Sequence, residues 1–232
     1  MHLDSLTLQT TDLDLLLPFY RDVLELPVQQ ENETLRIQAG ATTLQFQSAR
    51  STDDPARYHF AFNIPANRLP EAKQWVQSRV ALIRDRNGDD AFFSEEWNAD
   101  NIYFRDPAGN ILELIARHNL ENTTEAPFGP NQIRNISEIG VVPEDVSALR
   151  EQLQREAALE PYRSFSDEFA AVGDETGLFV IAAPGREWNP DSGLAAAPYP
   201  LEVQFRNNQG QRFRLVALPY RLLPAGVPSE SP

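Results

Sequence analysis

The chain contains no cysteine among its 232 residues, and this absence excludes disulfide bonds, thiolate metal ligands and a cysteine nucleophile. Lysine is nearly absent as well. Lys73 is the single lysine, and it follows Pro70 in an expected surface helix, so Schiff-base chemistry is not expected. No apolar run approaches the roughly 20 residues that span a bilayer. The sequence therefore predicts no thiol-based or amine-based mechanism and no membrane partner.

Positive charge is also scarce. The chain has 20 Lys and Arg residues against 34 Asp and Glu, which gives a formal net charge of −14. A phosphate backbone would be repelled, so nucleic acid is not an expected partner, whereas a cationic small molecule would be attracted. The first four residues show no basic segment leading into an apolar stretch, so we expect no secretion signal and a cytoplasmic location.

Four short segments alternate polar and apolar residues, which is the period of a strand with two different faces. They cover residues 5–9, 43–47, 59–63 and 111–115. One face is apolar. The other face carries Ser5, Gln45, His59 and Glu113. It is too polar for an ordinary core, and it predicts a cup-shaped, solvent-accessible cavity that holds a ligand or a metal ion.

The segments belong to a repeated order of elements: a strand, a helix and three further strands. Two such units occupy residues 1–117, residues 118–132 form a linker, and a third unit begins near residue 136. Residues 104–116 match residues 205–217 at a constant offset, so a fourth unit is reduced to its closing hairpin. Pro18 predicts a turn first and then a helix that begins near it.

We therefore predict an α+β protein of tandem βαβββ modules, in which one complete pair forms a cup-shaped barrel and a reduced second pair follows. The predicted parts are a first domain over 1–117, a linker over 118–132, a second domain over 133–223 with a reduced last module, and a disordered tail over 224–232.

This arrangement resembles the vicinal oxygen chelate superfamily, which includes glyoxalase I, fosfomycin-resistance thiol transferases, extradiol dioxygenases and bleomycin-resistance proteins. The residues that carry the resemblance are Leu3–Leu8, Pro18–Leu24, Tyr58–Phe62, and Asp106–Asn110 leading into Leu112–Leu114. The match is good over 1–117 and weaker over 133–218. It is specific for the fold and not for the reaction.

The resemblance implies a metal site at four strand positions, which fall here on Ser5, Gln45, His59 and Glu113. A common arrangement in the superfamily has His at the first and third positions and Glu at the fourth. His59 and Glu113 match it, Gln45 is compatible with it, and Ser5 departs from it. An imidazole and a carboxylate suit divalent Fe, Mn, Ni or Zn, and the remaining positions would be left to water or a bidentate substrate.

Structural alternatives exist for these residues, and Ser5 could be a remnant of a lost ligand position. His59 could be a hydrogen-bonded histidine of the barrel wall, and Glu113 could pair with an arginine or reach water. Gln45 could hydrogen-bond in the cavity without binding metal, and Trp97 could pack under a loop.

In the later units, Glu138 takes the first ligand position and Arg214 takes the position of Glu113. If both point inward, an ion pair could replace a metal there.

The leading function is a metal-assisted lyase, isomerase or ring-cleaving dioxygenase acting on a small oxygen-rich organic molecule. Glu113 is the predicted catalytic residue. The predicted metal ligands are His59, Glu113 and Gln45, and the predicted substrate-binding residues are Ser5, Asn63 and Trp97.

The alternative is a metal-free protein that binds a cationic antibiotic, as in bleomycin resistance; the net charge and Ser5 favour it. In a third interpretation, the reduced second half buries its open strand edge in a homodimer. This interpretation is compatible with the metal-free binding protein.

Overall fold

The computed structural model describes residues 1–49, 55–218 and 220–224. The tail expected over 224–232 lies outside these residues except for Pro224, which ends a strand. The described chain is an α+β fold of repeated βαβββ units, as predicted. No helix within the described ranges is long and apolar enough to cross a membrane.

The elements follow the predicted order of units. The first unit comprises β1 (His2–Thr10), α1 (Leu13–Pro18), β2 (Val28–Glu31), β3 (Thr34–Ala39) and β4 (Thr42–Ser48). The second comprises β5 (His59–Ile64), α2 (Leu69–Gln77), β6 (Phe92–Ser94), β7 (Ala99–Arg105) and β8 (Ile111–Arg117). The third comprises β9 (Asn135–Val141), α3 (Val146–Ala157), β10 (Phe169–Asp174) and β11 (Gly177–Ala182). The reduced fourth unit comprises β12 (Leu201–Arg206), β13 (Arg212–Ala217) and β14 (Arg221–Pro224).

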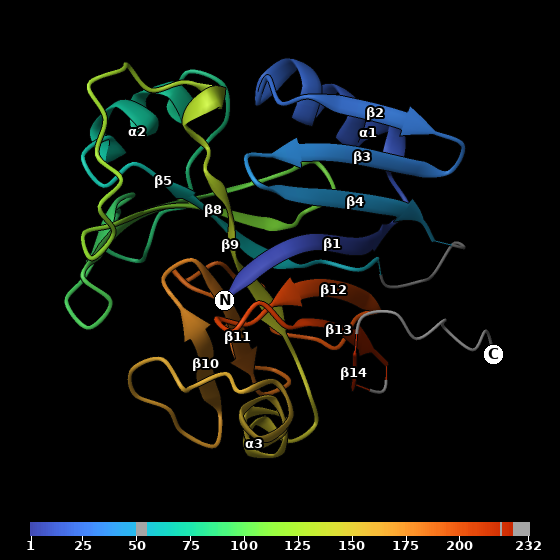
Figure 1. Ribbon diagram of the computed structural model, residues 1–232. Coiled ribbons are helices and arrows are strands. Elements are labelled where there is room, and N and C mark those ends of the chain that lie inside the picture. Colours follow the sequence, from blue (N-terminus) through green and yellow to red (C-terminus); the bar gives the residue numbers. More distant parts are fainter. Residues whose placement is uncertain (50–54, 219, 225–232) are drawn as a thin grey trace.

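The strands form two seven-stranded sheets (Figure 1). One sheet, which we call sheet A, has the order β14-β13-β12-β1-β4-β3-β2, and the other, sheet B, has the order β10-β11-β9-β5-β8-β7-β6. Each sheet is thus built from two units. At the junction of the two units, the first strand of one unit pairs with a strand of the other. β1 pairs with β12, and β5 pairs with β9, both antiparallel.

This pairing of units differs from the expectation that the first and second units share one barrel. The first unit shares sheet A with the fourth, and the second shares sheet B with the third. Within a unit the pairing is local: β1 lies parallel to β4, and β5 lies parallel to β8. Between units, the pairing depends on which open strand edges meet in space. Every open edge offers the same backbone donors and acceptors, so the order of units along the chain does not determine the pairing. The domain boundaries at 117 and 133 stay a prediction.

The repeated hairpin turns form for the same local reason in two units. The side chain of Asp106 accepts a hydrogen bond from the Asn110 backbone N–H at 3.0 Å, between β7 and β8. The side chain of Asn207 accepts one from the Gln211 backbone N–H at 2.9 Å, between β12 and β13. An Asx side chain at the start of each turn thus supports the tight reversal that the sequence repeat predicts.

The helix near Pro18 is placed differently from the expectation. α1 ends at Pro18, and a π-helical turn over Phe19–Val23 follows it. Proline lacks the backbone N–H that would continue the regular ladder, which accounts for the change of hydrogen-bonding pattern there. α3 begins as predicted, because the Asp145 side chain accepts a hydrogen bond from the Ala148 N–H at 2.9 Å.

One apolar core joins the inner faces of the two sheets and the buried sides of the helices. Phe179 of β11 and Phe205 of β12 meet edge to face with ring centroids 5.1 Å apart, which ties sheet B to sheet A. The opposite face of sheet B has its own smaller apolar cluster, which includes Tyr103, Val180 and Trp188. That second face carries the polar groups described next.

Candidate metal site

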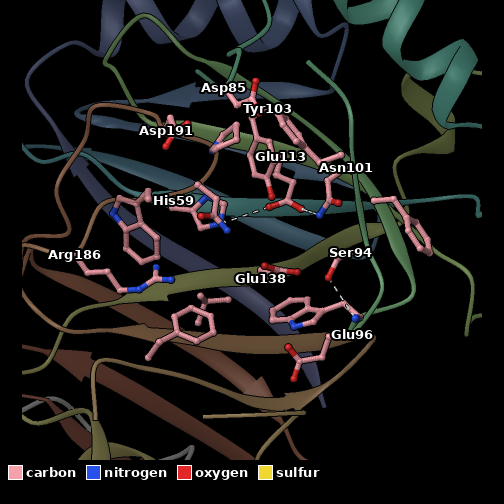
Figure 2. A pocket seen from close by; sticks show the side chains of 18 of the residues that line it. His59, Asp85, Ser94, Glu96, Asn101, Tyr103, Glu113, Glu138, Arg186 and Asp191 are labelled. Atoms are coloured by element: carbon pink, nitrogen blue, oxygen red, sulfur yellow. Dashed lines mark hydrogen bonds and ion pairs between the residues drawn. The ribbon is translucent and has the colours of Figure 1, made fainter. Parts of the chain in front are cut away.

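Three acid and imidazole side chains converge on adjacent strands at the centre of sheet B (Figure 2). His59 comes from β5, Glu113 from β8 and Glu138 from β9. Ala61 of β5 pairs with both glutamates, and His59 lies two residues before Ala61, so all three side chains share one face. One ligand atom from each lies within 4.8 Å of the other two.

His59 is held as a neutral imidazole. Its ring is buried, and desolvation lowers its pKa to about 4. Its Nδ1 lies 3.3 Å from the Ile111 carbonyl oxygen and can donate a proton there, which leaves a lone pair on Nε2. Nε2 lies 3.6 Å from Oε2 of Glu113. Two acceptor atoms therefore face each other, and a proton or a cation must lie between them.

Glu113 has no charged hydrogen-bond donor of its own. Its Oε1 accepts a hydrogen bond from Asn101 Nδ2 at 2.6 Å, and the Tyr103 hydroxyl also donates to the Glu113 carboxyl group. Both donors are neutral. Burial, and then the negative charge of Glu138, raise the pKa of Glu113 to about 8. Without a cation beside it, this carboxyl holds a proton at neutral pH.

Glu138 is paired instead with a buried arginine. The guanidinium of Arg117 donates to Oε1 of Glu138 through Nη2 and to Oδ1 of Asn63 through Nε at 3.2 Å. The Arg117 side chain is fully buried. Burial raises the pKa of Glu138, while the charge and hydrogen bond of Arg117 oppose that shift. One oxygen of Glu138 is thus held by Arg117, and the other remains for a ligand.

The expected ion pair between Glu138 and Arg214 is wrong. Arg214 lies on β13 in sheet A, where its Nε is 3.8 Å from Oε1 of Glu202. Glu138 lies in sheet B, and its partner is Arg117. The sequence comparison placed Glu138 and Arg214 in one barrel, but the third and fourth units belong to different sheets.

The cluster fits a divalent metal ion. One imidazole nitrogen and two carboxylate oxygens form a donor set that suits Zn(II), Mn(II) or Fe(II). At metal–ligand distances of about 2.0–2.2 Å, two ligand atoms lie at most about 4.4 Å apart, so the site needs little contraction. The hydrogen bond from Nδ1 of His59 to a backbone carbonyl is the usual support of a metal-binding histidine. The dication would also compensate Glu113.

Two of the residues predicted from sequence lie elsewhere. Ser5 and Gln45 are on β1 and β4 of sheet A, half-buried, and neither lines the cavity at the cluster. The structure brings His59 and Glu113 together with Glu138, where the prediction had Gln45. Sequence reasoning did note Glu138 at a ligand position of the third unit, but it joined the units in the wrong pairs.

The predicted substrate-binding residues are divided in the same way. Trp97 lines the cavity, and its ring lies 5.4 Å from Cζ of Arg117. Asn63 is buried beside the cluster and donates to the Glu175 carbonyl at 2.8 Å, but it does not line the cavity. Its visible role is to accept from Arg117 and so to hold the partner of Glu138.

The cluster opens into a cavity of about 640 Å³. Sheet B forms its floor, and its walls come from β6 and the segments on either side of it, from the connection between α3 and β10, and from the connector between β11 and β12. The walls are rich in rings and in acidic groups. The aromatic members are Phe92, Phe93, Trp97, Tyr103, Phe169 and Trp188, and the charged members besides the cluster are Asp85, Glu96, Asp191 and Arg186. Trp188 and Arg186 lie in a Pro/Gly-rich connector, where strand periodicity offers no signal.

Comparison with known proteins agrees with this fold. The sequence profile of a family described as "Glyoxalase-like domain" matches residues 5–115. Among the curated proteins searched, none matches the chain.

Two solved structures share the fold over nearly the whole chain. One is described as a "putative dioxygenase" from Bacillus subtilis, with 14% identity, a TM-score of 0.60, and coverage of 93% of this chain and 84% of that one. The other is the V278E mutant of glyoxalase I from Zea mays, with 13% identity, a TM-score of 0.54, and coverage of 93% and 92%. Residues 5–115 thus match a glyoxalase-like domain, and the chain shares the fold of these two structures, in agreement with the resemblance to the vicinal oxygen chelate superfamily.

Proposed function

We propose that this protein is a metal-dependent enzyme that acts on a small oxygen-rich organic molecule in the cavity of sheet B. His59, Glu113 and Glu138 would hold the ion. The observation that carries the proposal is the pair of facing acceptors, Nε2 of His59 and Oε2 of Glu113, 3.6 Å apart and buried at the base of a cavity. A metal ion satisfies both acceptors, and the cavity leaves room for substrate.

Three protein ligands leave coordination positions open on the cavity side. A bound divalent ion there would act as a Lewis acid on substrate oxygens. The chain's own groups supply orientation and proton handling. Asn101 and Tyr103 hold the Glu113 carboxylate in place, and Arg117 holds Glu138. Glu113, with its raised pKa, is the group suited to hold or release a proton at Oε2. This role agrees with its predicted assignment as the catalytic residue.

The test is metal binding by purified full-length protein. After treatment with chelator, the protein is titrated with Fe(II), Mn(II), Ni(II) or Zn(II), and the melting temperature and bound metal are measured. We expect close to one ion per chain and a rise in melting temperature. His59→Ala and Glu113→Ala should abolish both effects.

Two matched controls separate the site from general effects. His118→Ala removes a partly exposed histidine that pairs with Asp100 at 2.8 Å, and Gln45→Ala removes the ligand expected from sequence. Both variants should bind metal as the parent does. Equal metal binding by His59→Ala and the parent protein would refute the proposed site.

A second function is favoured by a separate observation. The cavity is lined by five carboxylates, Asp85, Glu96, Glu113, Glu138 and Asp191, and by one guanidinium. Such a wall, together with its aromatic rings, could bind a cationic small molecule without a metal. A protein that binds none of the four ions but binds an aromatic amine would be this binding protein and not the enzyme.

A further inference from the structure

Arg186 is a basic side chain in the wall of the cavity, and it is fixed at its base. It lies in the connector between β11 and β12. Its backbone N–H donates to the Ala183 carbonyl at 3.2 Å, and its carbonyl accepts from the Ala196 N–H at 2.7 Å. In Figure 2 its guanidinium extends toward the side of the cavity that holds His59 and Glu138. The group is therefore presented to the cavity by an anchored backbone.

The guanidinium of Arg186 has little to satisfy it within the protein. It lies over the Phe169 ring, with Cζ 4.5 Å from the ring centroid. Its one side-chain hydrogen bond among the described residues runs from Nη1 to the Glu187 carbonyl, and at 3.4 Å it is long. No carboxylate in the described part of the chain forms an ion pair with it. Burial lowers its pKa, and the charge of Glu168 opposes the shift. Most of its five N–H donors are thus free for a ligand.

The acidic groups around the mouth are in a different state, because each already has donors. Asp85 accepts from the backbone N–H groups of Asn87 and Asp89 in its own turn, at 2.9 and 2.8 Å. Asp191 accepts from the Arg86 N–H at 3.1 Å and pairs with its side chain.

Glu96, the third acid of the mouth, accepts from the Ser164 N–H at 2.8 Å. Among the described charged groups of the wall outside the cluster, Arg186 is therefore the one that has neither an ion pair nor a short hydrogen bond.

Aromatic rings line the cavity beside Arg186 and beside the metal cluster. Trp188 lies two residues after it, and the Trp188 ring centroid is 5.2 Å from that of His59. The Trp188 ring fills the space over Gly140, where a Cβ would lie 2.7 Å from Cη2. The cavity thus combines the oxygen-binding chemistry of the cluster, flat aromatic walls, and a guanidinium that lies over the Phe169 ring.

We propose that Arg186 recognises a carboxylate of the molecule that the cavity binds. The substrate is then a small planar, aromatic or conjugated carboxylate whose other end carries the oxygens for the cluster. A guanidinium fork matches a carboxylate with two parallel hydrogen bonds, and stacking on Phe169 holds the fork in plane. The assignment of the oxygen-bearing end rests on the proposed function, whereas the carboxylate contact does not require the metal.

The experiment compares three probes with the same phenol ring and different charge: 4-hydroxyphenylacetate, its neutral analogue tyrosol, and the cation tyramine. Binding to full-length protein is measured by calorimetry at constant ionic strength, once with chelator and once with Mn(II). We expect the anion to bind about tenfold more tightly than tyrosol, because a charged hydrogen-bonded contact contributes about 1.5 kcal/mol or more. Tyramine should bind most weakly.

Variants then assign the preference to one side chain. Arg186→Gln should lose the tenfold preference for the anion, and Arg186→Lys should keep part of it, because lysine is a point charge without the planar fork. Arg212→Gln, at the exposed start of β13 in sheet A, is the matched control and should bind all three probes as the parent does.

The outcomes separate this inference from the proposed function. A preference for the anion with no metal uptake would support the role of Arg186 and refute the enzyme. Metal uptake with equal binding of the anion and tyrosol would support the enzyme and refute the role of Arg186. Tightest binding of tyramine, or no binding of any probe at millimolar concentration, would overturn the assignment of Arg186.

Discussion

The substitution Glu113→Gln should make the metal-free protein more stable while it destroys metal binding. Gln is nearly the same shape as Glu. Its amide oxygen can accept from Asn101, and its amide NH₂ can donate to Nε2 of His59, which faces an acceptor 3.6 Å away whenever Glu113 is ionised. The substitution removes a carboxyl that burial and Glu138 make costly to ionise. Function and stability therefore oppose each other at this residue.

The size of the effect follows from the pKa of Glu113. The folded protein holds a proton on Glu113 up to about pH 8, whereas the unfolded chain releases it near the ordinary value of 4.5. The stability of the metal-free protein therefore falls as pH rises from about 4.5 to about 8, because the folded state binds more protons there. At about 1.4 kcal/mol per pKa unit, the loss is below about 1 kcal/mol at pH 5 and reaches about 3 kcal/mol at pH 7.

The assay is urea denaturation with chelator present, followed by tryptophan fluorescence, at pH values from about 5 to about 8. The difference in free energy of unfolding between Glu113→Gln and the parent should grow steadily over this range. Added Mn(II) at about 100 times its dissociation constant should raise the parent's stability by about 2.7 kcal/mol and leave the variant unchanged.

The same substitution on β9, on the other side of β5, should have the opposite sign. Glu138→Gln leaves Arg117 buried with no anionic partner among the groups that contact it, so it should cost about 3–5 kcal/mol. Glu202→Gln, beside Arg214 in sheet A, should stay within about 0.5 kcal/mol of the parent. A constant difference for Glu113→Gln at all pH values, or a loss of stability at pH 8, would refute the argument that Glu113 is a buried, uncompensated acid.

Three further substitutions test the frame around the site. Gly140→Ala should destabilise the protein by about 1–3 kcal/mol in thermal denaturation and shift the emission of Trp188, because the new Cβ would lie 2.7 Å from the indole. Asp145→Ala should cost about 1 kcal/mol in urea denaturation, because the Ala148 N–H at the start of α3 loses its acceptor. Gln45→Ala should leave the metal content, measured by elemental analysis, unchanged, because Gln45 lies on β4 in sheet A. A loss of bound metal would show that Gln45 is a ligand after all.

Local patterns in the sequence were enough to predict the faces and the units. The alternation in residues 59–63 and 111–115 put His59 and Glu113 on one face of their strands, and both do share a face of sheet B. This prediction depended on two local properties, the period of a strand and the short-range order of elements within one βαβββ unit. The hairpin at Asp106–Asn110 was predictable for the same reason, since its turn residues act on their own backbone.

The third member of the cluster, its charge balance and the walls of the cavity depended on contacts far apart in the chain. Glu138 joins Glu113 because β9, and not a strand of the first unit, pairs with β5. Any open strand edge presents the same backbone donors and acceptors, so the order of residues does not say which two units will meet. Arg117, which forms an ion pair with Glu138 and not with Glu113, becomes a partner only when those strands are side by side.

The amino-acid sequence by itself determined the βαβββ units and the two side chains, His59 and Glu113, that one unit can orient through backbone periodicity. Tertiary structure decided that Glu138 replaces Gln45 beside them and that Arg186 faces the same cavity. The physical reason is range: side-chain direction along a strand is set within a few residues, whereas the pairing of strand edges and the desolvation of charge are set by the whole folded chain.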